Sequence, residues 1–95
     1  MKKYIKSNFS FLYRDNDWKA YKNSNGDITI ERNCMHYLDG LPDKVWTTVY
    51  VIEPSRLISY SPFGNKGTVS EHFNPELTPK ELEEKALALI SKQRN

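Results

Sequence analysis

Hydrophobic and polar side chains alternate along much of the chain before residue 74, which is the pattern of β-strands with one buried face. Strands are predicted at 9–13, 18–22, 28–32 and 45–52, with shorter extended segments at 34–38, 57–60 and 68–73. The hairpin of 18–22 with 28–32 is the most strongly indicated element. Asn25 and Gly26 lie between its strands, and both tolerate the positive φ of a tight turn.

The period of two assigns the side chains of this hairpin to two faces. The predicted inward face holds Trp18, Ala20, Ile28 and Ile30, and the opposite face holds Lys19, Tyr21, Thr29 and Glu31. By the same rule, Phe9, Phe11 and Tyr13 are expected to share one face. The strand at 45–52 is apolar or β-branched on both faces, so we expect it to be central and covered on both sides.

A helix is predicted at 78–93, after the strand pattern ends. Thr78, Pro79 and Glu81 supply an N-cap, a first-turn proline and the third-position glutamate of a capping box. An apolar stripe at helical period follows, formed by Leu82, Ala86, Leu89 and Ile90. The predicted fold is therefore α+β: a meandering antiparallel sheet of about five strands within 4–73, with one C-terminal helix packed on a face, in a single domain of residues 1–95.

Composition favours a folded, water-soluble protein over a disordered tail. The 95 residues are 38% hydrophobic, 13% aromatic and 27% charged, with a net charge of only +2. No stretch approaches the roughly 18 apolar residues that a membrane span needs. The lone Cys34 cannot form an internal disulfide, which favours a reducing compartment. We therefore expect a cytoplasmic location and no membrane contact.

Residues that could carry catalysis or bind metal are few. Cys34, His36 and His72 are the only soft ligands, one fewer than a structural zinc site needs, so no metal or cofactor is predicted. His36 and His72 could instead form the acid–base pair of a small metal-independent nuclease, but no spacing links them. The chain is therefore predicted not to be an enzyme, with the nuclease as one alternative. Gly64 to Gly67 is predicted to be a turn that closes a hairpin.

The first 22 residues interleave basic and aromatic side chains, a combination that single-stranded nucleic-acid binding uses. Such a module is the first alternative function, ahead of the nuclease. Its phosphate contacts would come from Lys2, Lys3, Lys6, Arg14 and Lys19.

The leading hypothesis is a small non-enzymatic protein that occludes or bridges a protein partner, of the inhibitor, immunity or phage accessory type. It rests on the absence of catalytic and nucleotide motifs and on an analogy of size. Tyr and Arg are enriched at interface hot spots. The predicted partner surface therefore comprises Lys19, Tyr21, Lys22, Arg32, Phe63 and Lys66. A homodimer is the other way to cover the second face of 45–52.

Overall fold

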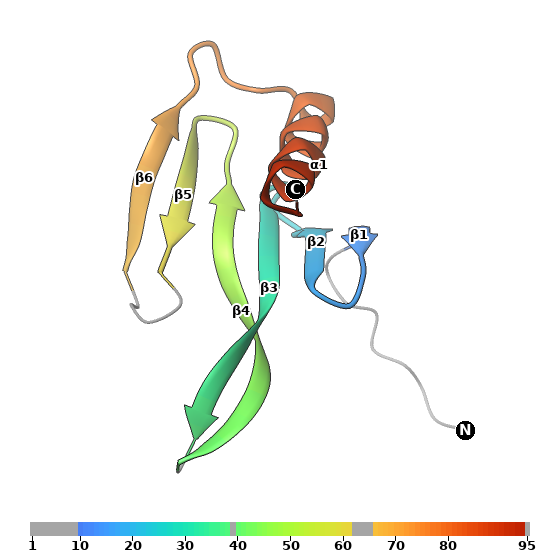
Figure 1. Cartoon of the computed structure of the whole chain (residues 1–95). Coiled ribbons are helices and arrows are strands. Elements are labelled where there is room, and N and C mark those ends of the chain that lie inside the picture. The colour runs from blue at the N-terminus through green and yellow to red at the C-terminus, as the bar shows by residue number, and fades with distance from the viewer. Residues whose placement is uncertain (1–9, 39, 62–65, 95) are drawn as a thin grey trace, which may run out of the picture.

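Six β-strands and one α-helix follow one another in the computed structural model, which describes residues 10–38, 40–61 and 66–94 (Figure 1). The elements are β1 (Ser10–Arg14), β2 (Trp18–Lys22), β3 (Ile28–Leu38), β4 (Leu41–Ile52), β5 (Arg56–Tyr60), β6 (Gly67–His72) and α1 (Pro79–Arg94). The strands form one antiparallel sheet in sequence order, and α1 packs on the β1–β3 part of one face. The predicted α+β fold is confirmed.

The described sheet is slightly larger than predicted, with six strands in place of about five. The segment at 34–38 is not a separate strand, because β3 runs unbroken from Ile28 to Leu38. Its partner β4 begins at Leu41 and not at Val45, since the whole length of β3 pairs with it. Residues 33–38 of β3 and 41–46 of β4 form a hairpin that projects beyond the rest of the sheet (Figure 1). We call this hairpin the arm.

The β2–β3 hairpin has the predicted turn and faces. Gly26 has a φ of +96°, which favours glycine, and its N–H donates to the Asn23 carbonyl at 2.9 Å. Four side chains of the predicted inward face are at most 5% exposed: Trp18, Ala20, Ile28 and Ile30. They join Ile52, Leu57, Leu82, Ala86 and Ile90 in the core between sheet and helix.

A β-bulge in β1 contradicts the predicted common face of Phe11 and Tyr13. Phe11 is opposite Tyr21 and Tyr13 is opposite Ala20, so β1 has one extra residue between these pairs. Tyr13 therefore packs against the core under α1, whereas Phe11 lies on the other face with Tyr21. Phe9 is outside the described residues.

A second bulge, in β4, reassigns the faces of that strand. Ile30 pairs with Tyr50 and Glu31 with Thr48, which leaves Val49 as the extra residue. Tyr50 consequently packs against the helix-side core, whereas Trp46 lies on the opposite face. Strand β4 is central, as predicted, but no described element covers its second face.

The helix begins with the predicted capping box. The Thr78 N–H donates to Glu81 Oε1 at 2.9 Å, and the Glu81 N–H donates to Thr78 Oγ1 at 3.2 Å. Leu82, Ala86 and Ile90 are buried against the sheet, and Leu89 is partly buried beside them. The predicted range of 78–93 differs from the observed helix by one residue at each end.

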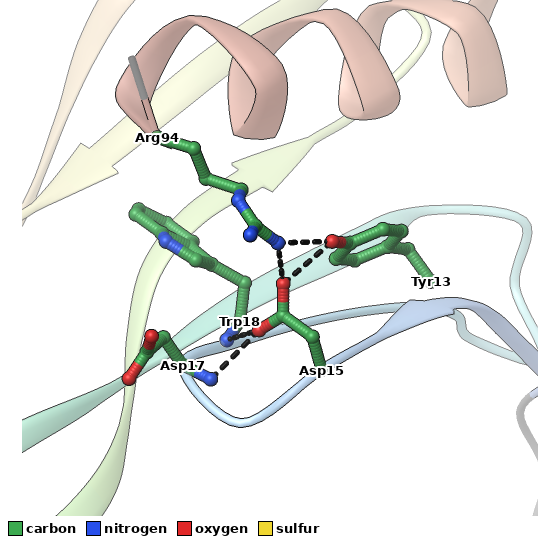
Figure 2. Close-up of polar contacts among 5 residues, drawn as sticks. All are labelled: Tyr13, Asp15, Asp17, Trp18 and Arg94. Atoms are coloured by element: carbon green, nitrogen blue, oxygen red, sulfur yellow. Dashed lines mark hydrogen bonds and ion pairs between the residues drawn. The ribbon is translucent and has the colours of Figure 1, made fainter.

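The last turn of α1 is tied to the β1–β2 turn by a polar cluster (Figure 2). Asp15 Oδ1 accepts the N–H groups of Asp17 and Trp18, both at 2.7 Å. Its other oxygen accepts the Tyr13 hydroxyl at 2.5 Å and pairs with the Arg94 guanidinium, which also donates to the Tyr13 oxygen. The Asp15 carboxylate thus both hydrogen-bonds the turn and forms the ion pair that holds the end of α1.

Truncation of Ile90 should destabilise the protein far more than truncation of its exposed neighbour Leu87. Ile90 is 2% exposed and Leu87 is 42% exposed. We expect Ile90→Ala to lower the free energy of unfolding by about 2–4 kcal/mol, because it leaves a cavity in a small core. Leu87→Ala should change it by about 0.5 kcal/mol or less. Urea denaturation measures both, and equal losses would show that α1 is not part of the core.

Loss of the Asp15 carboxylate should cost more than loss of the arginine that it pairs with. Asp15→Ala leaves two turn N–H groups without their acceptor and should cost about 1–3 kcal/mol. Arg94→Gln removes a half-exposed ion pair and should cost about 1 kcal/mol or less. Asp17→Ala is the matched control, because only its main-chain groups take part in these bonds. A large loss in the control would contradict this account of the turn.

Candidate functional site

The face of the sheet opposite α1 carries aromatic, aliphatic and basic side chains from all six described strands. We call it the open face. Its members, placed by strand register and side-chain contacts, are Phe11, Arg14, Lys19, Tyr21, Thr29, Glu31, Trp46, Thr48, Val51, Ile58 and Val69. No described element packs on this face.

Cationic groups lie over aromatic rings in the β1–β2 half of the open face. The Arg14 guanidinium is 5.4 Å from the centroid of the Phe11 ring, and Lys19 Nζ is 4.1 Å from the centroid of the Trp46 ring. Arg14 and Lys19 are directly opposite each other in the sheet. The rings of Phe11 and Tyr21 meet edge to face, 6.1 Å apart. Two basic groups and three rings therefore form one continuous patch.

Hydrogen bonds link side chains in the middle of the open face. The Tyr21 hydroxyl donates to Glu31 Oε2 at 3.1 Å, across the β2–β3 pair. Thr29 is only 8% exposed, and its hydroxyl oxygen accepts the Asn23 side-chain amide at 2.9 Å. Burial, reinforced by the negative charge of Glu31, raises the pKa of Tyr21 to about 12. Tyr21 is consequently a neutral, oriented ring throughout the physiological pH range.

Of the five predicted partner contacts that the structure describes, two lie on this face: Lys19 and Tyr21. Lys22 and Arg32 have the same parity along their strands as Ala20 and Ile30, so both lie on the helix side. There Lys22 Nζ is 3.6 Å from a carboxylate oxygen of Glu83.

Two further predicted partner contacts belong to the β5–β6 connection. Lys66 is exposed immediately before β6, four strands away from β2 in the sheet. Phe63 is outside the described residues. The described positions therefore do not form one surface, because the prediction combined both faces of the sheet with a distant loop.

Arg32 belongs to a small pocket on the helix side. Its guanidinium is 5.3 Å from the centroid of a Trp18 ring, and the pocket between them and the end of α1 has a volume of about 180 Å³. Cys34 and Gln93 also line it. Ligand sites for small molecules commonly hold about 300–1,000 Å³, and this pocket is smaller than that. An adjoining polar pocket beside Arg94, which Arg32 also lines, has a volume of about 310 Å³.

The alternative functions involve residues that the fold distributes unevenly. Of the basic residues predicted to contact nucleic acid, Arg14 and Lys19 are neighbours on the open face, whereas Lys2, Lys3 and Lys6 are outside the described residues. His36 is on the arm in β3 and His72 is on β6, with β4 and β5 between them. The fold therefore does not bring the two histidines together. Among the described residues, His, Cys, Asp and Glu form no group of three arranged to hold a metal.

Sequence reasoning missed Trp46 and the aliphatic part of the open face. Simple alternation puts Trp46 with Tyr50 and Ile52, and only the extra residue Val49 separates them. Val51 and Ile58 are opposite each other on the open face, and Ile58 is opposite Val69. A β-bulge leaves no reliable mark in one sequence, so the faces of β4 could not have been assigned from alternation alone.

The raised pKa of Tyr21 predicts a stability loss in strong alkali. The folded state holds the Tyr21 proton more tightly than the unfolded state, whose tyrosines titrate near 10. This contribution is complete below pH 10 and should disappear as the pH rises through about 12. Tyr21→Phe should reduce the loss in denaturation experiments, and Glu31→Gln should lower the Tyr21 pKa in an ultraviolet titration. An unchanged pKa in Glu31→Gln would contradict the role of that carboxylate.

No helix in the described part of the chain is long and apolar enough to cross a membrane. Comparison of the chain with protein-family models, with curated proteins and with solved structures finds no match.

Proposed function

We propose that this chain is a small non-enzymatic binding protein that occludes or bridges a protein partner through its open face. The observation that carries the proposal is that α1 packs on one face of the sheet while the other retains large apolar side chains. Phe11 is 47% exposed there. A surface that combines rings, aliphatic side chains and arginine has the composition of a protein interface.

The shape of the open face favours a macromolecular partner over a small ligand. Its members extend over all six strands, from Phe11 on β1 to Val69 on β6. The basic and aromatic patch would anchor the partner, and Val51 and Ile58 would supply the apolar centre. An inhibitor, immunity or phage accessory role fits such a broad contact. A cytoplasmic location is part of the proposal, since Cys34 is a free thiol.

A single-stranded nucleic acid is the second candidate ligand. It is favoured by one observation: Arg14 lies over the Phe11 ring and Lys19 over the Trp46 ring, and the two cations are opposite each other on β1 and β2. Bases would stack on the rings while the cations neutralise phosphates. Glu31 counts against it, because its carboxylate lies beside the same patch and repels phosphate.

The proposal is tested by capture from a nuclease-treated extract of the source cell, followed by titration of the purified partner. We expect Phe11→Ser to weaken binding about tenfold or more, as truncation of a hot-spot residue does. The matched control is Leu87→Ser on α1, away from the open face, which is similarly exposed at 42%. It should bind as the unmodified chain does.

Two outcomes would contradict the protein-binding proposal. If Phe11→Ser retains full affinity while Leu87→Ser loses it, the interface lies on the helix. If the chain instead binds a fluorescent oligothymidylate, with affinity that falls steeply with salt and with Arg14→Gln or Lys19→Gln, the second candidate is favoured. Circular dichroism of each variant shows that the fold is retained.

A further inference from the structure

The arm exposes a strand edge with unpaired main-chain groups. Strand β2 pairs with β3 only as far as Arg32, and beyond that point no described strand pairs with this side of β3. One bond continues the ladder there, from the Asn33 N–H to the Asp17 carbonyl at 2.9 Å. Main-chain N–H and C=O groups of successive residues point alternately to the two sides of a strand. Because the Asn33 N–H points toward the β2 side, the main-chain groups of Met35 and Tyr37 do so as well. The edge is therefore available over residues 34–38.

This edge is unguarded, in contrast to the others in the described sheet. Natural sheets protect their edges with charges, prolines and bulges. The opposite edge of the arm carries Pro42, Asp43 and Lys44. The two outer strands of the sheet, β1 and β6, each contain a bulge and a charged residue. Residues 34–38 contain no proline and no Asp, Glu, Lys or Arg, and Met35 is 50% exposed.

We propose that this edge pairs with the same edge of a second copy of the chain, in an antiparallel arrangement about a two-fold axis. When the two-fold axis passes beside His36, Met35 of each copy lies opposite Tyr37 of the other. Each such pair exchanges two hydrogen bonds, so every outward N–H and C=O of these two residues is satisfied in both copies.

Other registers fit less well. If the axis passed beside Met35, the second copy would have to accept a hydrogen bond from the Asn33 N–H, which already donates to the Asp17 carbonyl. The second strand would also run into the β1–β2 turn. A second copy also suits the edge electrostatically, because a neutral strand meets itself without like-charge repulsion. The arm would then become a four-stranded sheet, whereas a two-stranded ribbon is marginally stable by itself.

The contact is distinct from the open face, so its failure would leave the proposed function intact. Five paired residues form a small interface, and we expect a reversible dimer that is populated only at high protein concentration.

Disulfide trapping tests the register. In a Cys34→Ser background, His36→Cys places two thiols opposite each other across the axis, at a Cα separation of about 4.5 Å that a disulfide can span. Oxidised glutathione should convert this variant to the covalent dimer about tenfold faster than the control. The control is Asp43→Cys in the same background. Residue 43 is on β4, directly opposite His36 within one copy and away from the proposed contact. Equal rates would overturn the proposed register.

Sedimentation equilibrium of the unmodified chain tests the dimer itself. We expect the mean mass to rise above 11.1 kDa with concentration. Met35→Pro should abolish the rise without unfolding the arm, since the Met35 N–H points away from β4. Met35→Ala, which keeps that N–H, should still dimerise.

Main-chain amide exchange provides a readout that needs no substitution. The Met35 and Tyr37 amides should exchange more slowly as the concentration rises. A chain that stays monomeric up to about 1 mM, with exchange at these amides independent of concentration, would overturn the proposal. If the chain stays monomeric and the Met35 and Tyr37 amides slow only after a foreign protein is added, the edge binds that protein and not a second copy, which would also overturn the proposal.

Discussion

The limited width of one helix is the constraint on which the rest of this structure depends. An α-helix with its side chains is about 10–12 Å across, whereas six strands spaced by about 4.8 Å extend over roughly 24 Å. Helix α1 can therefore bury only the strands beneath it, and the core is confined to residues of β2–β5 and the helix stripe. Among the described residues, the arm, β6 and the open face contribute no side chain to that core, and β1 contributes only partly buried ones such as Tyr13 at its margin.

Polar contacts at the rim set the orientation of the helix more than its stability. Ion pairs join α1 to three different strands or turns: Lys22 with Glu83, Glu71 with Lys85, and Asp15 with Arg94. All involve partly exposed side chains, and such pairs contribute little to stability individually. Placed around the helix, however, they favour one direction of α1 across the sheet. The apolar stripe alone would permit a range of angles.

Local sequence signals predicted some elements well and the sheet faces only in part. The β2–β3 hairpin and α1 could be predicted because their determinants are local: Gly26 in the turn, and Thr78 with Glu81 at the helix start. The side-chain faces of β1 and β4 could not be predicted, because each strand contains one extra residue. Every side chain after that residue lies on the face opposite to the one that simple alternation gives it. For that reason the open face combines Tyr21, which alternation found, with Trp46, which it could not find.

The order of elements along the chain has a consequence for synthesis. Each hairpin of the meander forms between neighbouring segments, so the strands can pair as they leave the ribosome. Helix α1 is made after the six strands, yet it packs on β1, β2 and β3. Trp18, Ala20, Ile28 and Ile30 thus stay uncovered until α1 has left the ribosome. The nascent sheet offers both its faces to chaperones during that interval, and the emergence of α1 is the event that completes the core.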